Sequence, residues 1–255
     1  MSELTMDRLR ENLESLKMKN TLEILDNYLE RAVAENLNIV EVLDHIFSEE
    51  TKSKRKRAYE KQVQMSGFPI KKTLDDFDFS FQPSIDKRQI DELATMRFLE
   101  NGENVVFLGP PGVGKTHLAS ALGLVAAQHR FSTYYINCHQ LIEQLKKAHF
   151  ENRLPDKLKI LAKYRMLIID EIGYTPISRG QANRFFTFIS DTYETSSIIF
   201  TTNKEIVDWA EMMGDPVLTT AMLDRILHHA KCYSFRGESY RLKHPDLYPQ
   251  GETGM

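Results

Sequence analysis

The segment GPPGVGKT constrains the fold of this chain more than any other stretch of its sequence. It matches the pattern G-x-x-x-x-G-K-[ST], follows the apolar run NVVFL and opens a stretch of helical character, THLASALGLVAAQ. Between a strand and a helix, such a loop turns consecutive backbone N–H groups toward a phosphate at the helix N-terminus. The sequence therefore predicts a phosphate-binding loop of Gly109, Pro110, Pro111, Gly112, Val113, Gly114, Lys115 and Thr116.

Two further segments supply polar groups that suit the chemistry of a nucleoside triphosphate. Lys115 is expected to reach the β- and γ-phosphates, and the Thr116 hydroxyl to coordinate Mg²⁺. The apolar run MLIID is followed by a glutamate, so that Asp170 is placed to hold the Mg²⁺ shell and Glu171 to polarise an attacking water. The run SIIFTTN ends in Asn203, which either contacts the γ-phosphate or attacking water or begins the next helix.

Five short apolar or β-branched runs, separated by segments of helical character, define the expected architecture. They lie at 104–108, 132–137, 166–170, 197–201 and 232–235. Most are apolar throughout rather than at alternate positions, which is typical of parallel strands covered on both faces. We therefore expect an α/β domain of the P-loop NTPase type, with helices on both sides of a mainly parallel sheet.

The N-terminal part has a different character. Before residue 68 there is one glycine and no proline, and apolar residues recur at helical spacing, which predicts three amphipathic helices. Gly67, Pro69 and Pro83 then mark a boundary. We expect a small all-α module at 1–66 and the α/β domain at 67–255.

Composition excludes several classes of protein. The chain has 255 residues and no apolar run near the roughly 18 residues of a membrane helix, and its charged N-terminus does not resemble a secretory signal. Two distant cysteines, Cys138 and Cys232, indicate neither a disulfide framework nor a structural zinc site. We expect a cytoplasmic protein with no membrane partner.

The charge is segregated along the chain. With 33 Lys+Arg and 36 Asp+Glu the formal net charge is -3, which alone disfavours a nucleic-acid partner. Residues 1–50, however, have 5 basic and 12 acidic side chains, whereas 51–61 have 6 and 1, and 146–165 have 7 and 2. The two basic segments are either solvated helix faces or phosphate-binding surfaces.

The order of the motifs resembles that of AAA+ ATPases, and the segments around GPPGVGKT and LIIDEIGYTPIS resemble the IstB family, ATP-binding helper proteins of bacterial insertion sequences related to DnaC-type helicase loaders. The resemblance covers essentially the whole chain. It implies an ATP- and Mg²⁺-dependent homo-oligomer that binds double-stranded DNA and supports a transposase. It assigns Asn203 to sensor 1 and Arg225, in AMLDRILHH, to an arginine finger. Arg225 could instead pair on a helix surface with Asp224 or Glu211.

The resemblance also indicates where DNA would bind, and the chain differs from the usual AAA+ pattern near its C-terminus. An extra helix between the second and third strands lines the DNA path in that clade, and the acidic 1–50 segment would serve protein contacts. Without a base-reading motif, we expect sequence-independent duplex binding. The usual AAA+ helical lid is shortened or absent, which leaves Arg241 as the candidate for sensor 2. The predicted DNA-binding residues are Lys52, Lys54, Arg55, Lys56, Arg57, Lys146, Lys147, Arg153 and Lys157.

Some alternatives remain open. A replicative helicase loader would share the ATPase core, and a small-molecule kinase would share the phosphate loop, although Glu171 beside Asp170 disfavours a kinase. Phe77, Phe79 and Phe81 either line the adenine pocket or belong to the core. Because they are adjacent, His228 and His229 are expected to point to different sides of a helix and not to share a metal.

Overall fold

A computed structural model describes residues 3–173 and 177–243 of the chain, without the side chains of 3, 211 and 212. The chain divides into two compact units, Met1–Lys61 and Gln62–Met255. The sequence placed its boundary between residues 66 and 67. The division falls earlier, inside helix α3 (Ile39–Met65), because Val63 packs against the core of the second unit and the Gln62 side chain donates to the Phe131 carbonyl.

The N-terminal unit contains α1 (Glu3–Ser15), α2 (Lys19–Ala34) and most of α3, which confirms the predicted helical region. These helices bury one small apolar cluster, because their apolar residues recur every three or four positions and so share a face. The cluster comprises Leu13, Met18, Leu25, Tyr28 and Ile46.

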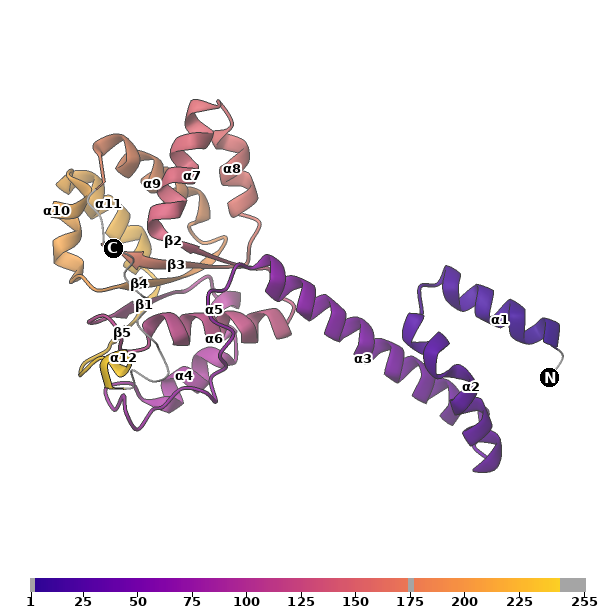
Figure 1. Cartoon of the computed structure of the whole chain (residues 1–255). Coiled ribbons are helices and arrows are strands. Elements are labelled where there is room, and N and C mark those ends of the chain that lie inside the picture. The colour runs from indigo at the N-terminus through magenta and orange to yellow at the C-terminus, as the bar shows by residue number, and fades with distance from the viewer. Residues whose placement is uncertain (1–2, 174–176, 244–255) are drawn as a thin grey trace, which may run out of the picture. The chain divides into compact units, whose positions relative to one another are not determined.

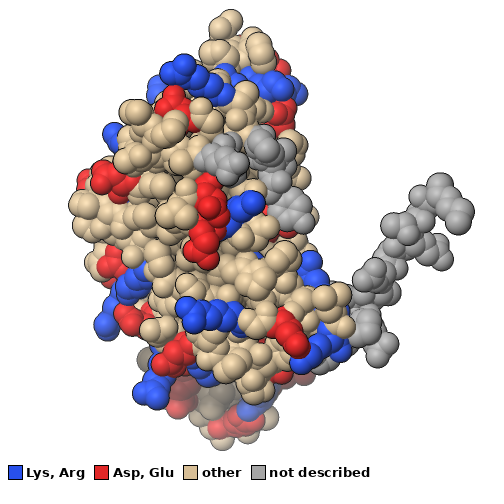
Figure 2. Space-filling model, turned by 90° about the vertical axis from the view of Figure 1, so that its left-hand side faces the viewer, with Lys and Arg blue, Asp and Glu red and all other residues tan. Residues whose placement is uncertain are grey.

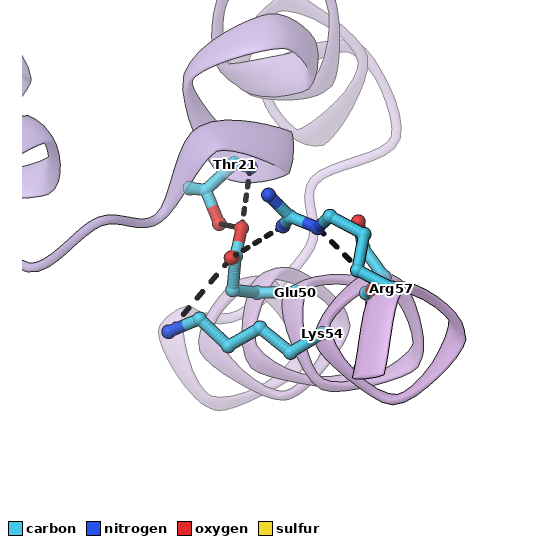
Figure 3. A network of polar contacts seen from close by, with 5 residues as sticks. Thr21, Glu50, Lys54 and Arg57 are labelled. Atoms are coloured by element: carbon cyan, nitrogen blue, oxygen red, sulfur yellow. Dashed lines mark hydrogen bonds and ion pairs between the residues drawn. The ribbon is translucent and has the colours of Figure 1, made fainter. Parts of the chain in front are cut away.

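A buried carboxylate joins α2 to α3 (Figure 3). Glu50 of α3 accepts hydrogen bonds from the backbone N–H and hydroxyl of Thr21, at 2.9 and 3.2 Å. Thr21 lies in the first turn of α2, where backbone N–H groups have no partner within the helix, so that Glu50 serves as a tertiary cap. Lys54 and Arg57 form ion pairs with the same carboxylate, at 3.8 and 3.4 Å.

The second unit is built on a five-stranded sheet in which every pairing is parallel (Figure 1). The strand order is β2-β3-β4-β1-β5, which confirms the α/β prediction. The strands are β1 (Asn104–Leu108), β2 (Thr133–Asn137), β3 (Met166–Ile172), β4 (Ser197–Thr202) and β5 (Ala230–Ser234).

Helices cover both faces of this sheet. Helices α4 (Lys87–Ala94), α5 (Arg97–Glu100) and α6 (Lys115–Gln128) lie on one face, and α7 (Cys138–Phe150), α8 (Leu154–Leu161), α9 (Arg179–Thr192) and α11 (Pro216–Leu227) on the other (Figure 1). The remaining described elements are the 3₁₀ helix η1 (Ile206–Asp208), α10 (Trp209–Met213) and α12 (Tyr240–Lys243).

Alternate residues of the central strands enter two different apolar cores. In β3, Met166 and Ile168 pack with α4, α5 and α6, whereas Leu167 and Ile169 pack with α7, α8 and α9. This arrangement explains why the strands are apolar at consecutive positions. It leaves the carboxyl ends of the strands as the edge where polar side chains gather. Among the described residues, no helix is both long and apolar enough to cross a membrane.

Candidate nucleotide-binding site

The GPPGVGKT loop connects β1 to α6 at the carboxyl edge of the sheet. Gly112 and Gly114 have φ angles of +80° and +100°, in the region that favours glycine. A Cβ atom would lie 2.0 Å from the hydroxyl oxygen of Ser239 at Gly112, and 2.6 Å from the Phe77 ring at Gly114. Both the loop conformation and its close packing therefore require glycine at these positions.

The Lys115 side chain folds across this loop. Its Nζ donates hydrogen bonds to the carbonyl oxygens of Gly109 and Pro110, each at 2.7 Å. Burial lowers the pKa of Lys115 to about 8, against the opposing attraction of Asp170. The hydrogen-bond partners of this ammonium are neutral carbonyls, and burial outweighs the attraction of the nearby carboxylates, so that the loop suits an anionic phosphate.

The two predicted Mg²⁺ ligands are in direct contact. The Thr116 hydroxyl lies 3.0 and 3.1 Å from the two carboxylate oxygens of Asp170, which is 2% exposed. Asp170 also accepts hydrogen bonds from the hydroxyls of Tyr135 and Thr201. Hydroxyl and carboxylate oxygens are the ligands that Mg²⁺ prefers, so that the donor set fits this ion.

Glu171 has an unusual backbone conformation for a strand residue. Its φ is +61°, and the pairing of β3 with β4 shifts register between Ile169 and Ile172. The left-handed conformation is costly for a residue with a side chain, and such strain concentrates at functional sites. The irregularity exposes Glu171 at the sheet edge, whereas Asp170 beside it is buried.

The Glu171 carboxylate is held by a neighbouring strand. Its Oε2 accepts a hydrogen bond of 2.5 Å from the side-chain amide of Asn137, at the end of β2. The same Asn137 caps α7, because its Oδ1 accepts a hydrogen bond of 2.9 Å from the backbone N–H of His139. One asparagine thus connects the predicted catalytic carboxylate to the start of a basic helix.

The other predicted groups occupy different positions. Asn203 directly follows β4 and is exposed at the same sheet edge. Arg225 lies near the C-terminal end of α11, which leads into the amino end of β5, so that it is at the opposite edge from the phosphate loop. Its guanidinium lies over the Phe186 ring, 4.8 Å from the centroid, and donates to the Ala221 carbonyl at 2.9 Å. Within the described residues it forms no ion pair with Asp224, and the side chain of the other candidate partner, Glu211, lies outside the described part of the chain.

A cavity lies beside the phosphate loop and is lined in part by aromatic side chains. Phe77, Phe81 and Tyr240 contribute to its wall, together with Arg241. Phe81 and Tyr240 meet edge to face, with ring centroids 4.9 Å apart. Phe79 lines a separate hollow beside α6 instead. Of the three phenylalanines named from the sequence, two therefore border the site.

The predicted DNA-binding residues of α3 are not equivalent. Lys52 pairs with Glu49 at 2.7 Å, while Lys54 and Arg57 pair with Glu50. In the part of the chain that the structure describes, no ion pair is recorded for Arg55 or Lys56. Helical geometry places these two residues on the side of α3 away from Glu50.

The predicted two helices between β2 and β3 are α7 and α8. The predicted DNA-binding residues on them are also not equivalent. Lys146 pairs with Glu143 at 3.4 Å, and Arg153 pairs with Glu151. Burial lowers the pKa of Lys157, whereas Lys147 is exposed. In the view of Figure 2, Lys and Arg side chains lie at the top of the second unit, at the height of α7 and α8 in Figure 1, with acidic side chains among them.

The expectation that His228 and His229 point to different sides of a helix is wrong. Their ring centroids are 4.0 Å apart, because α11 ends at Leu227 and His229 lies in the turn that leads into β5.

Sequence reasoning did not find Asn137, Tyr135 or Thr201. Each reaches the site through the pairing of β2 and β4 with β3, in which Asn137 stands opposite Asp170. Polar residues at the carboxyl ends of the second and fourth predicted strands were the available signal.

The parallel sheet, the loop after β1, the acidic pair near the carboxyl end of β3 and the strand order define a P-loop ATPase fold of the AAA+ type. Solved structures agree. The DnaC helicase loader superposes with a TM-score of 0.51 at 24% identity, covering 64% of this chain and 96% of that one. DnaI gives a TM-score of 0.55 at 21% identity over 65% of this chain and 92% of that one. AMPPCP-bound DnaA from Aquifex aeolicus gives 0.53 at 18% identity, covering 71% and 55%.

Within this class, the chain belongs to the family of IstB-like ATP binding proteins, whose model matches residues 11–247. It is 47% identical over 236 residues to a protein of insertion sequence IS232 in Bacillus thuringiensis subsp. berliner, covering 92% of this chain and 94% of the relative. It is 45% identical over 238 residues to a protein of IS21 in Pseudomonas aeruginosa, covering 93% and 90%. Both relatives are named as ATP-binding proteins.

Proposed function

We propose that this protein hydrolyses ATP to ADP and phosphate with Mg²⁺ and uses the cycle to control its assembly on duplex DNA, where it recruits or stimulates the transposase of an insertion sequence. The observation that carries the ATPase part is the direct contact of Thr116 with Asp170, with Glu171 next along the strand. ATP and DNA meet in the cytoplasm, which is where we expect the protein to act.

The proposed roles follow from the chemistry of each group. Thr116 and Asp170 would hold Mg²⁺, which neutralises charge on the phosphates when it is bound. Lys115 exchanges its carbonyl partners for phosphate oxygens. Glu171, released from Asn137, accepts a proton as water attacks the γ-phosphorus and the bond to the β–γ bridging oxygen breaks. Asn203 orients that water or contacts the γ-phosphate.

Arg225 acts on the site of a neighbouring subunit in this proposal. Within one chain, α11 ends at the amino edge of the sheet while the phosphate loop lies at the carboxyl edge. The guanidinium would have to leave Phe186 to stabilise charge on a γ-phosphate. A homo-oligomer is therefore part of the proposed mechanism.

Duplex binding is proposed for the two basic segments, Lys52, Lys54, Arg55, Lys56 and Arg57 on α3 and Lys146, Lys147, Arg153 and Lys157 on α7 and α8. Phosphate contacts by such side chains would give sequence-independent affinity with strong salt dependence. Arg55, Lys56 and Lys147 should contribute most, since no recorded ion pair within the described chain occupies them. The relatives' place in insertion sequences favours a transposase partner.

The proposed ATPase activity is tested by two substitutions, one expected to affect hydrolysis and the other nucleotide binding. Glu171→Gln should keep ATP binding and lower hydrolysis by at least about 100-fold, because a general base of this kind contributes 10² or more. Lys115→Ala should lose nucleotide affinity itself. Fluorescent-nucleotide binding and phosphate release measure the two effects separately, and normal turnover by Glu171→Gln would remove Glu171 from the mechanism.

The proposed DNA surface is tested by reversing charge at positions of the two basic segments for which the described residues show no ion pair. Lys147→Glu, and separately Arg55→Glu with Lys56→Glu, should weaken binding to every duplex and reduce the salt slope by about 1 per lost phosphate contact. Arg88→Glu is the matched control, because Arg88 is exposed on α4, outside both basic segments. Equal affinity and slope in all variants would refute the assignment.

A replicative helicase loader is the alternative function. The likeness to DnaC and DnaI shows the fold alone and does not decide between the two functions. Purified protein with ATP should retain the transposase encoded by its own insertion element in a pull-down. Retention of a replicative helicase instead of that transposase would favour the alternative.

A further inference from the structure

Three potential metal ligands lie together at the edge of the sheet opposite the phosphate loop. Glu194 follows α9 and precedes β4, while His228 and His229 connect α11 to β5. One ligand atom from each residue lies within 4.8 Å of the other two, and all three residues are exposed. The cluster therefore brings two imidazoles and a carboxylate from two separate loops to one accessible point.

The backbone beneath these ligands is fixed by one asparagine at the start of β1. The Asn104 N–H donates to the His229 carbonyl at 2.7 Å, and its side-chain amide donates to the Ile226 carbonyl at 2.9 Å. Its side-chain oxygen accepts from the Ile198 N–H at 2.9 Å. Asn104 thus holds the connection into β4 and the connection into β5 in fixed relation.

The His228 ring has a hydrogen-bond partner on the nitrogen that would not bind the metal. The Tyr193 hydroxyl oxygen is 2.7 Å from Nδ1 of His228. Histidines that bind metals with one ring nitrogen usually engage a hydrogen-bond partner with the other. Nδ1 bonded to Tyr193 leaves Nε2 of His228 as the ligand atom.

We propose that Glu194, His228 and His229 bind a divalent transition-metal ion of the Zn²⁺ class. Two imidazoles and one carboxylate form a ligand set of catalytic zinc sites, with the fourth position left for water. Mg²⁺ is a poor fit because it prefers oxygen ligands in octahedral geometry. The bound ion would fasten the α9–β4 connection to the α11–β5 connection, independently of the nucleotide.

The ligand separation is close to that of a formed site. Zinc bonds of 2.0–2.1 Å in a tetrahedron place ligand atoms about 3.4 Å apart. The atoms in the cluster lie within 4.8 Å of one another, and all three side chains are exposed. In the proposed site, rotation of these side chains closes the remaining gap.

The test is a titration of the full-length, tag-free protein with Zn²⁺ in competition with a chromophoric chelator, in the presence of Mg²⁺. We expect one zinc ion per chain. His229→Ala and Glu194→Gln should each weaken binding by at least tenfold, and Tyr193→Phe should weaken it less. His149→Ala is the control, because it removes an exposed histidine on α7 that is not part of the cluster.

Two further readouts separate a specific site from surface binding. Zinc should raise the melting temperature of the wild type and of His149→Ala but not that of the His228→Ala, His229→Ala double variant, whose melting temperature without zinc serves as the folding check. Co²⁺ should give visible absorption bands that the double variant lacks. Absence of saturable binding, equal binding by the double variant, or displacement of zinc by Mg²⁺ would overturn the proposal.

Discussion

At the scale of single residues, the candidate site depends on polar groups that constrain one another. Asp170 is buried among hydroxyl donors, whereas Glu171 reaches the surface through a left-handed backbone and is held by Asn137. The same two adjacent carboxylates therefore have different environments. One is suited to hold an ion, and the other to move toward a water molecule.

The Asn137–Glu171 contact predicts restrained hydrolysis in the resting protein. Asn137→Ser should keep an oxygen that can cap α7 but should not reach Glu171. A hydrogen bond to an exposed carboxylate contributes about 1 kcal/mol, so that ATP turnover without DNA should rise about fivefold. Steady-state phosphate release measures this change, and an unchanged or lower basal rate would mean that Asn137 does not restrain Glu171.

Lys115 predicts a pH dependence of nucleotide binding. Its pKa of about 8 in the free protein should rise when phosphate charges surround it. Binding then takes up a proton, and ATP affinity should fall as pH rises through about 8. Calorimetry at pH 8 in two buffers of different ionisation enthalpy measures this uptake. Identical heats in both buffers would contradict the prediction.

At the scale of elements, the sequence predicted a strand or loop correctly wherever the residues of that segment alone indicate it. The five strands were predictable because each contains a short apolar or β-branched run, and the loop at 109–116 was predictable from its glycine-rich motif. The contacts of Asn137 and Thr201 were not, since they depend on which strands become neighbours. Arg225 shows the same limit, because its partner Phe186 lies on another helix.

The tertiary cap on α2 gives a stability prediction at this scale. Glu50→Ala removes a buried acceptor from the Thr21 N–H and should destabilise the N-terminal helices by about 1–3 kcal/mol. Hydrogen exchange of the amides in α1 and α2 measures the local free energy of opening. Glu49→Ala is the control, because its surface pair with Lys52 contributes less than about 1 kcal/mol. Equal protection in both variants would contradict the capping role.

At the scale of the whole molecule, the net charge conceals how charge is distributed along the chain. The net charge of -3 combines an acidic N-terminal segment with two basic ones. Even within the basic segments, ion pairs occupy several side chains, which the sequence alone could not reveal.

The oligomer proposed above predicts complementation between two inactive variants. Arg225→Ala should bind ATP but hydrolyse it at least about 10³-fold more slowly, the effect expected of an arginine finger. Lys115→Ala should be inactive because it lacks nucleotide. Mixed assemblies contain sites with an intact Lys115 facing an intact Arg225, so that turnover should partly recover. Mixtures no more active than either variant would place Arg225 outside the mechanism.

The central claim, that ATP controls assembly on duplex DNA, is tested most directly by fluorescence anisotropy of a labelled duplex. The Glu171→Gln protein is titrated at fixed salt with ATP and Mg²⁺, with ADP, and without nucleotide. We predict tight binding with ATP and at least tenfold weaker binding in the other two conditions, for duplexes of unrelated sequence. Equal affinity in all three conditions would contradict the account.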